Sequence, residues 1–183
     1  MTHVTASKNL DKIADKRALF PGTFDPITLG HDDLIKRALN IVDEVVIGVS
    51  TADGKKPLLS AEQRMNLIKD IYKDNDRIKV VPMQGLLVDF VASREIDIVI
   101  RGLRNAHDMV YESEMLSMNR VLGEVSNIVY ETILLYPSDS VRYISSTRVR
   151  EVALLQGDIS LFVLPQVAEL VKGVVKNGSN NNG

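Results

Sequence analysis

The chain contains no cysteine, so disulfide bonds, thiolate metal sites and cysteine nucleophiles are excluded. It also lacks an apolar run of about 18 residues, the length that a membrane-spanning helix needs, and we expect no contact with a membrane. The formal net charge of −2 argues against a broad surface for nucleic acid or for anionic lipid. Anionic ligands would therefore have to be bound by basic residues at particular points of the fold.

The two ends of the chain are predicted to lie outside the folded domain. Residues 1–16 lack the apolar core and cleavage site of a secretory signal, so we expect a flexible leader and a cytoplasmic protein. Residues 177–183 (NGSNNNG) are polar, which predicts a disordered tail. With 45% hydrophobic and 25% charged residues, the remaining residues 17–176 suit one globular domain.

Short β-branched runs alternate with amphipathic segments along this domain. The β-branched runs predict five strands, at residues 17–20, 44–50, 77–82, 97–101 and 128–136. The amphipathic segments predict helices at residues 31–42, from the capping box at Ser60 to Ile71, and at 86–94, 107–122, 147–155 and 165–176. This order predicts an α/β fold: a single doubly wound, five-stranded parallel sheet with helices on both faces and a C-terminal helix.

The segment from the first strand to the following helix is rich in turn residues, with Pro21, Gly22 and Pro26 close together. Thr28 is expected to cap the helix, so that the first-turn amides and the ring of His31 face the end of the strand. A helix start of this kind attracts negative charge. We predict an anion-binding loop that contains an imidazole, although His31 bonded to a loop carbonyl is an alternative.

Polar and cationic residues also follow the other strands, and ligands of parallel sheets bind beyond the carboxyl ends of the strands. The groups are Thr23 to His31, Lys55 and Lys56, Gly85 and Leu86, Arg101 to Arg104, and Ser145 to Thr147. Each group alone is explained by a solvated loop. Five groups at one edge favour a shared anion site.

The segment GTFDPITLGH (residues 22–31) resembles the signature of the nucleotidylyltransferase superfamily, in which His or Thr, any residue, Gly and His follow one another. GKKP (54–57), RGLR (101–104) and YISST (143–147) make the chain similar to the phosphopantetheine adenylyltransferases of coenzyme A synthesis. This resemblance implies a Rossmann-like fold and adenylyl transfer from ATP to 4′-phosphopantetheine, with release of pyrophosphate. It also implies a homohexamer that coenzyme A inhibits.

The resemblance further implies roles for individual residues. It implies that His31, Lys55 and Arg101 are catalytic. The residues implied for binding 4′-phosphopantetheine are Thr23, Lys55, Leu87 and Arg101. The residues implied for ATP are Thr23, Phe24, His31, Gly102, Leu103, Arg104, Glu112, Val141, Arg142, Tyr143, Ile144, Ser145, Ser146 and Thr147. Mg²⁺ is expected to arrive on the ATP phosphates, and no dedicated metal site is expected. Val110, Val141 and Arg142 depart from residues that are frequent in the family.

The expected chemistry needs no strong general base, because a phosphate nucleophile is already an anion. Positioning and electrostatics can supply most of the acceleration. Asp25, before Pro26, is predicted to be only a turn former. The alternatives are a nucleotidylyltransferase acting on nicotinamide mononucleotide or on a sugar or polyol phosphate, a non-catalytic module that senses ATP or coenzyme A, and a tRNA-charging enzyme. The last is disfavoured because the chain lacks room for an anticodon domain.

Overall fold

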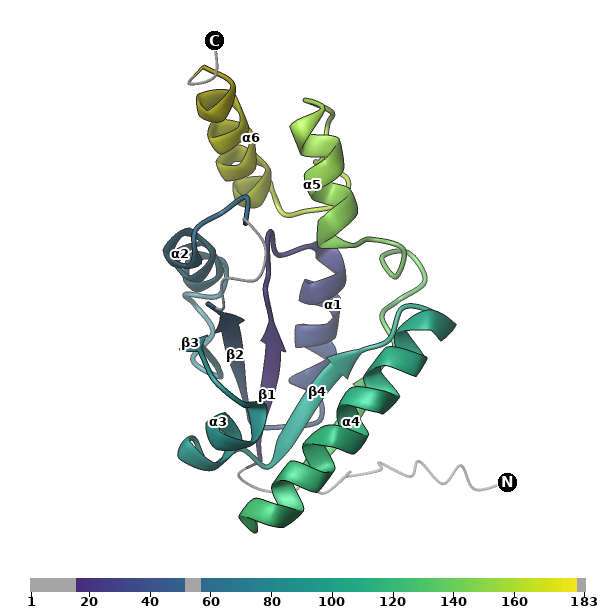
Figure 1. Ribbon diagram of the computed structural model, residues 1–183. Helices are drawn as coiled ribbons and strands as arrows, with labels where there is room; N and C mark the ends of the chain where they lie inside the picture. Colours follow the sequence, from purple (N-terminus) through teal and green to yellow (C-terminus); the bar gives the residue numbers. More distant parts are fainter. Residues whose placement is uncertain (1–15, 52–56, 181–183) are drawn as a thin grey trace, which may run out of the picture.

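The computed structural model describes residues 16–51 and 57–180 of the protein. Within them, five strands form one parallel sheet in the order β3-β2-β1-β4-β5 (Figure 1). The strands are β1 (Arg17–Gly22), β2 (Glu44–Ser50), β3 (Ile78–Met83), β4 (Ile98–Gly102) and β5 (Glu131–Leu135). The chain builds the sheet outward from β1 to β3, then returns to place β4 on the other side of β1. The predicted doubly wound α/β fold is confirmed, and the strand order reverses beside β1.

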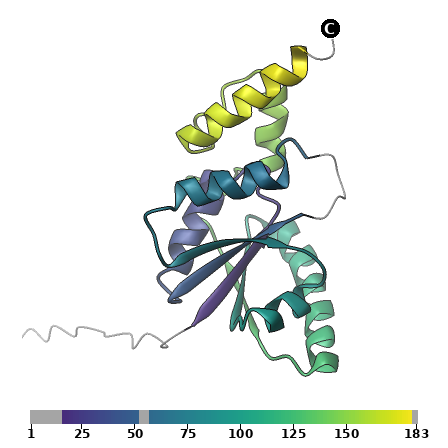
Figure 2. The ribbon, with the colours of Figure 1, turned by 90° about the vertical axis from the view of Figure 1, so that its left-hand side faces the viewer.

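Helices cover both faces of this sheet (Figure 2). They are α1 (Leu29–Ala38), α2 (Ala61–Ile71), α3 (Leu87–Ser93), α4 (Ala106–Ser126), α5 (Ser146–Leu154) and α6 (Pro165–Asn180). The helices α1 and α2 lie on one face, whereas α3 and α4 lie on the other (Figures 1 and 2). The helices α5 and α6 stand beyond the carboxyl ends of the strands (Figure 1). None of the helices in the described residues is long and apolar enough to cross a membrane.

The two hydrophobic cores follow from the two-residue period of the strands. In β1, Ala18 and Phe20 belong to the larger core, under α1, α2, α5 and α6. Leu19, between them, points into the smaller core with Phe90 of α3. Leu19 lies in register with Val46 of β2, which also belongs to the smaller core. Both faces of the central strands are therefore buried, and these strands hold the loops that follow them in place.

The ends of three helices differ from the sequence prediction. The helix α1 ends at Ala38, four residues before the predicted Val42, because Leu39 to Ile41 form a turn. The helix α4 passes through Gly123 and ends at Ser126, and its C-cap residue Asn127 has a left-handed φ of 54°. Gly123 is needed for another reason: a Cβ there would lie 3.0 Å from the carbonyl oxygen of Ile128, where the chain folds back. The helix α6 continues past Lys176 to Asn180, because no proline follows. Asn, Gly and Ser each destabilise a helix by only about 1 kcal/mol or less relative to alanine, against about 3 kcal/mol for proline.

The predicted leader and tail are described only at their inner edges. The backbone N–H and Nζ of Lys16 donate to Asp43 at 3.2 Å and Asp97 at 2.7 Å, and this joins the last residue of the predicted leader to the domain. Residues 177–180 of the predicted tail belong to α6, so the helix crosses the boundary expected at residue 176. Residues 1–15 and 181–183 lie outside the described residues.

Candidate active site

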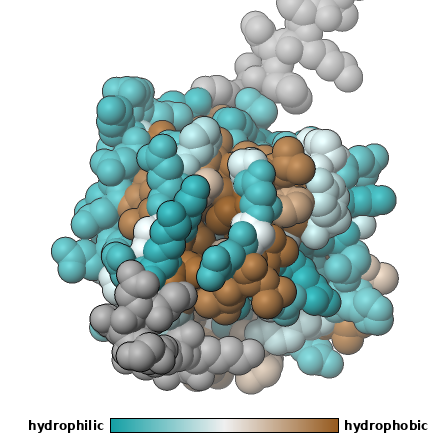
Figure 3. Space-filling model, turned by 90° about the horizontal axis from the view of Figure 1, so that it is seen from above, coloured by the Kyte–Doolittle hydropathy of each residue, from teal (hydrophilic) through white to brown (hydrophobic). Residues whose placement is uncertain are grey.

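A cavity of about 800 Å³ opens at the carboxyl edge of the sheet, beside the ends of β1 and β4. Most of the predicted site residues line it: Thr23, Phe24, His31, Arg101, Gly102, Arg104, Glu112, Val141, Ile144, Ser145, Ser146 and Thr147. Among the described lining residues, arginines outnumber carboxylates: Arg64, Arg101, Arg104 and Arg150 against Asp25 and Glu112. This excess of positive charge suits an anionic ligand. Figure 3 looks down on this end of the molecule and shows apolar surface bounded by polar residues.

Other predicted site residues lie away from the cavity wall. Leu103 is only 6% exposed, and its N–H donates to a carbonyl of β5. Leu87, the first residue of α3, packs against the smaller core. Arg142 forms an ion pair with Asp139 at 3.3 Å, and Tyr143 is exposed. Any contact of these four residues with a ligand is therefore at the cavity mouth or requires a rearrangement.

His31 is held in one orientation by the residue that caps its own helix. The backbone N–H of Thr28 donates to Nδ1 of His31 at 3.1 Å, and the Thr28 hydroxyl lies 3.0 Å from the same nitrogen. Because a backbone N–H can only donate, Nδ1 must accept, and the neutral ring carries its proton on Nε2. Burial, with a smaller contribution from the positive charge of Arg104, lowers the pKa of His31 to about 4. At neutral pH the ring is a neutral donor.

Aromatic packing completes the setting of the imidazole. The ring of Phe24 lies edge-on to His31 with centroids 5.1 Å apart, and Phe20 lies at 6.3 Å. Phe24 is 2% exposed and has a left-handed φ of 51°. Its ring passes over Gly22, where a Cβ would lie 2.9 Å from the ring. Phe24 therefore supports the imidazole from the core, in addition to lining the cavity.

Arg101 and Glu112 both line the cavity and form a two-point ion pair with each other. Nε and Nη2 of Arg101 donate to the two carboxylate oxygens of Glu112 at 2.7 and 2.8 Å. Glu112 is 8% exposed, so this is a strong, charge-assisted contact. The resemblance assigned these residues to different substrates, and nothing in their spacing indicated that they pair. Lys55, assigned to the same phosphate as Arg101, lies outside the described residues.

The side of the cavity predicted for ATP has a cation and a helix start. Nε and Nη2 of Arg104 donate to Asp108 at 2.9 and 3.2 Å, in an exposed pair one helical turn apart. Ser145 caps α5 by accepting from the N–H of Arg148 at 3.3 Å, and Ser145, Ser146 and Thr147 line the cavity. The first amides of a helix lack partners within it and attract anions. The starts of α1 and α5 therefore border one cavity.

Comparison with known proteins places the chain among enzymes. The family model described as cytidylyltransferase-like matches residues 19–152. The phosphopantetheine adenylyltransferase of Cupriavidus taiwanensis is 44% identical over 151 residues, which cover 82% of this chain and 91% of the relative. This chain belongs to the phosphopantetheine adenylyltransferase family. The Nitrosospira multiformis protein of the same name is 41% identical over 152 residues, 83% of this chain and 90% of that one.

Solved structures of other proteins share the fold. Plasmodium falciparum nicotinic acid mononucleotide adenylyltransferase, in complex with NaAD, superposes with a TM-score of 0.64 at 15% identity. The match covers 89% of this chain and 95% of the other. The lipopolysaccharide core biosynthesis protein of Thermoplasma volcanium has a TM-score of 0.51 at 26% identity, over 68% and 98% of the two chains. The Rossmann-like fold expected from the family signature is confirmed.

Sequence reasoning missed Asp25 as a site residue. It is 2% exposed, and its two carboxylate oxygens accept from the backbone N–H groups of Leu58 and Leu59, both at 2.9 Å. Arg150 of α5 donates to the carbonyl oxygen of Asp25. Asp25 thus joins the loop after β1 to the turn before α2 and to α5. The interpretation of Asp25 as only a turn former is therefore incomplete. Its position inside the GTFDP segment, next to predicted site residues, could have indicated a role in the site.

Arg64 was also missed, although it lines the cavity from α2. It is 4% exposed and donates to the carbonyl oxygens of Thr23 at 2.6 Å, Ser50 at 2.9 Å and Leu59 at 3.1 Å. These contacts fix the ends of β1 and β2 relative to each other. The signal was a cation next to the apolar face of a predicted helix, beside Leu67 and Ile68.

Among the described residues, no group of three His, Asp or Glu side chains could hold a metal ion.

Proposed function

We propose that this protein transfers the adenylyl group of ATP to the phosphate of 4′-phosphopantetheine, giving dephospho-coenzyme A and pyrophosphate. The observation that carries the proposal is one cavity, in a chain of this family, that is lined by a neutral His31 in the first turn of α1, by arginines and by the start of α5. A cavity of this charge and size can bring two polyanions together.

In the proposed reaction, an oxygen of the 4′-phosphate attacks the α-phosphorus of ATP. The new P–O bond forms as the bond to the bridging oxygen breaks, and the electron pair leaves with pyrophosphate. Nε2–H of His31 donates to the α-phosphate and bridging oxygen as charge builds up there. A donor that is fixed before the reaction and meets its acceptor best in the transition state lowers the barrier without an exchange of protons.

The other residues hold the reactants. Thr23, Lys55 and Arg101 bind the phosphate of phosphopantetheine, and Leu87 contacts its pantetheine arm. Arg104 and the start of α5 (residues 145–147) bind the β- and γ-phosphates, and the loop at residues 141–144 bounds the nucleotide. Glu112 orients Arg101 through the two-point ion pair, which supports this assignment. Mg²⁺ enters as part of the ATP complex, because it needs few protein ligands when phosphates supply oxygens.

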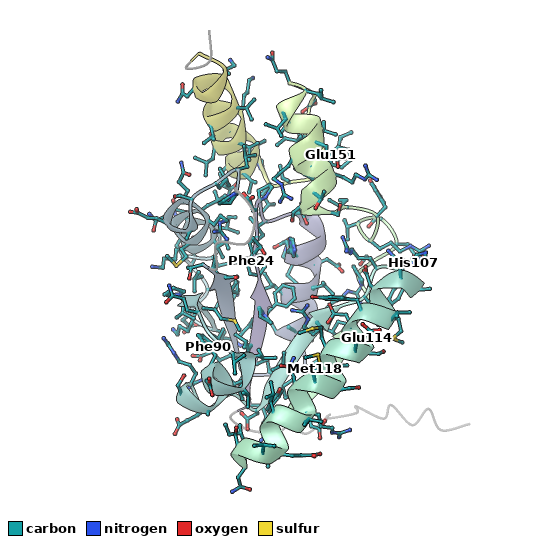
Figure 4. All side chains as sticks on the ribbon, in the orientation of Figure 1. Phe24, Phe90, His107, Glu114, Met118 and Glu151 are labelled. Atoms are coloured by element: carbon teal, nitrogen blue, oxygen red, sulfur yellow. The ribbon has the colours of Figure 1, made fainter. Side chains whose placement is uncertain are left out.

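We also propose a homo-oligomer, a hexamer, that acts in the cytoplasm without nucleic acid and is inhibited by coenzyme A. The exposed apolar side chains of α4 support an interface between copies, since a large exposed apolar patch is unusual on a monomer. These side chains are Met109, Val110, Tyr111, Met118, Val121 and Val125. Figure 4 shows Met118 on this outer helix.

The test is pyrophosphate release from ATP with a panel of acceptors: 4′-phosphopantetheine, nicotinamide mononucleotide and glycerol phosphate. We expect turnover with the first acceptor, and a fall of about 10²–10³-fold in kcat for His31→Ala, as for loss of a transition-state donor. ATP binding, measured by calorimetry, should persist in this variant. Turnover with nicotinamide mononucleotide alone would refute the choice of acceptor, and ATP binding without turnover on any acceptor would favour a sensing module.

A further inference from the structure

The loop between β5 and α5 (residues 136–145) is attached to α1 by a compact polar cluster outside the cavity. Asp33 accepts two hydrogen bonds from Ser138, one from the backbone N–H at 2.8 Å and one from the hydroxyl at 2.7 Å. Arg37 donates to Asp33 at 2.8 Å and to the hydroxyl of Ser138 at 2.6 Å. We call this group, Asp33, Arg37 and Ser138, the loop clamp.

The loop clamp holds a segment that forms part of the cavity wall. Pro137, Val141 and Ile144 of this loop line the cavity, whereas Asp33, Arg37 and Ser138 do not. The loop is also internally ordered from Ser138, whose carbonyl accepts from the N–H groups of Val141 and Arg142, both at 3.0 Å. A shift of Ser138 would therefore carry the cavity-lining residues with it.

The helix that carries the loop clamp also carries the imidazole. Gly30, Asp33 and Arg37 are three and four positions apart, so they share one face of α1. At Gly30 a Cβ would lie 3.3 Å from the carbonyl oxygen of Val141, so the helix and loop backbones approach closely at this second point. His31 faces the cavity from the same turn of the helix. One rigid element thus sets both the imidazole and the loop.

We propose that Asp33 is a positioning residue for ATP: through Ser138 it sets how far the loop at residues 136–145 lies from Nε2 of His31. This inference rests on the proposed function, because it takes the loop to bound the nucleotide. Burial disfavours the charged form of Asp33, but hydrogen bonds from Ser138 and Arg37 outweigh it and hold the pKa of this carboxyl below its usual value. The clamp therefore stays charged at neutral pH.

The experiment compares two variants of neighbouring residues on α1. Asp33→Asn keeps the shape of the side chain but places an amide N–H₂ against donors from Ser138 and Arg37. The matched control is Lys36→Gln, which breaks an ion pair of the same i,i+4 spacing between the exposed Lys36 and the buried Asp32. Neither residue of this pair contacts the loop. We expect Asp33→Asn to raise the KM for ATP about tenfold, the effect of losing roughly 1.4 kcal/mol of binding, with the KM for phosphopantetheine within about twofold of wild type.

A second readout does not depend on catalysis. Hydrogen exchange at the amides of Val141 and Arg142 should be faster in Asp33→Asn than in Lys36→Gln, in the protein without ligand. Ser138→Ala, which removes only the hydroxyl, should show a smaller change in the same direction and serves if Asp33→Asn does not fold. Equal KM values for ATP and equal exchange in Asp33→Asn and Lys36→Gln would overturn the inference. A wild-type protein without adenylyl transfer would overturn the proposed function instead, and exchange would still test the clamp.

Discussion

The lowered pKa of His31 predicts how the stability of the protein depends on pH. A histidine with a pKa of about 4 in the folded state and 6.5 in the unfolded state takes up its proton more readily when the chain unfolds. Below pH 6.5 the unfolded state therefore binds more protons, and the free energy of unfolding falls as pH falls toward 4. From these two values, the contribution of His31 between pH 7 and pH 5 is a loss of about 2 kcal/mol.

The perturbation is His31→Gln, which keeps a polar side chain but cannot titrate. Urea unfolding at pH 7 and at pH 5 gives the free energy of unfolding of each protein. Between these two pH values, the free energy of unfolding should fall by about 2 kcal/mol more for the wild type than for His31→Gln. This holds whatever the difference in stability between the two proteins at pH 7. Carboxylates that titrate in this range are present in both proteins, so their effect cancels.

The matched control is His107→Gln, which changes an exposed histidine at the start of α4, away from the cavity (Figure 4). This variant should follow the wild-type dependence on pH. If His31→Gln and the wild type lost the same stability between pH 7 and pH 5, the surroundings of the ring would not lower the pKa of His31. The inference that burial keeps the ring neutral well below pH 6.5 would then be wrong.

Three other variants test the cavity. Glu112→Gln should raise the KM for phosphopantetheine, because Arg101 loses its two-point partner. The control Glu114→Gln, on the exposed face of α4, should leave this KM unchanged, and equal KM values in the two variants would contradict a role for the Arg101–Glu112 pair. Arg104→Gln should raise the KM for ATP about tenfold or more, since a hydrogen bond to a charged group contributes about 1.5–3 kcal/mol, and an unchanged value would remove Arg104 from the phosphate site. Asp25→Asn should lower the free energy of unfolding by about 1–3 kcal/mol in a urea titration, because a buried backbone N–H loses its charged acceptor. A smaller loss would mean that the contacts of Asp25 with the turn before α2 do not stabilise the protein.

Local patterns predicted the fold well because they act over a few residues. The strand β2 has the predicted bounds, since a run rich in β-branched residues and buried on both faces favours a strand. The capping box at Ser60 is confirmed by its hydrogen bond from the N–H of Gln63 at 3.1 Å. Gly123 misled the prediction of the end of α4, because a glycine can serve either a helix end or the close approach of another segment.

The sequence predicted which strand ends carry the residues of the candidate site, but not which side chains contact each other there. Residues after parallel strands meet at one edge whatever their partners are, so His31 and Arg101 were expected in one cavity, as found. The contacts of Asp33 with Ser138 and of Arg64 with Ser50 join distant parts of the chain. No local periodicity encodes such contacts, because they depend on how α1 and α2 pack on the finished sheet.

The most direct test of the proposed function is a competition in one reaction. The protein is mixed with ATP, Mg²⁺ and equal concentrations of 4′-phosphopantetheine and nicotinamide mononucleotide, and the products are identified by mass spectrometry. We predict dephospho-coenzyme A as the dominant product, with one pyrophosphate released for each molecule formed. A dinucleotide as the dominant product, or pyrophosphate without dephospho-coenzyme A, would contradict the proposal.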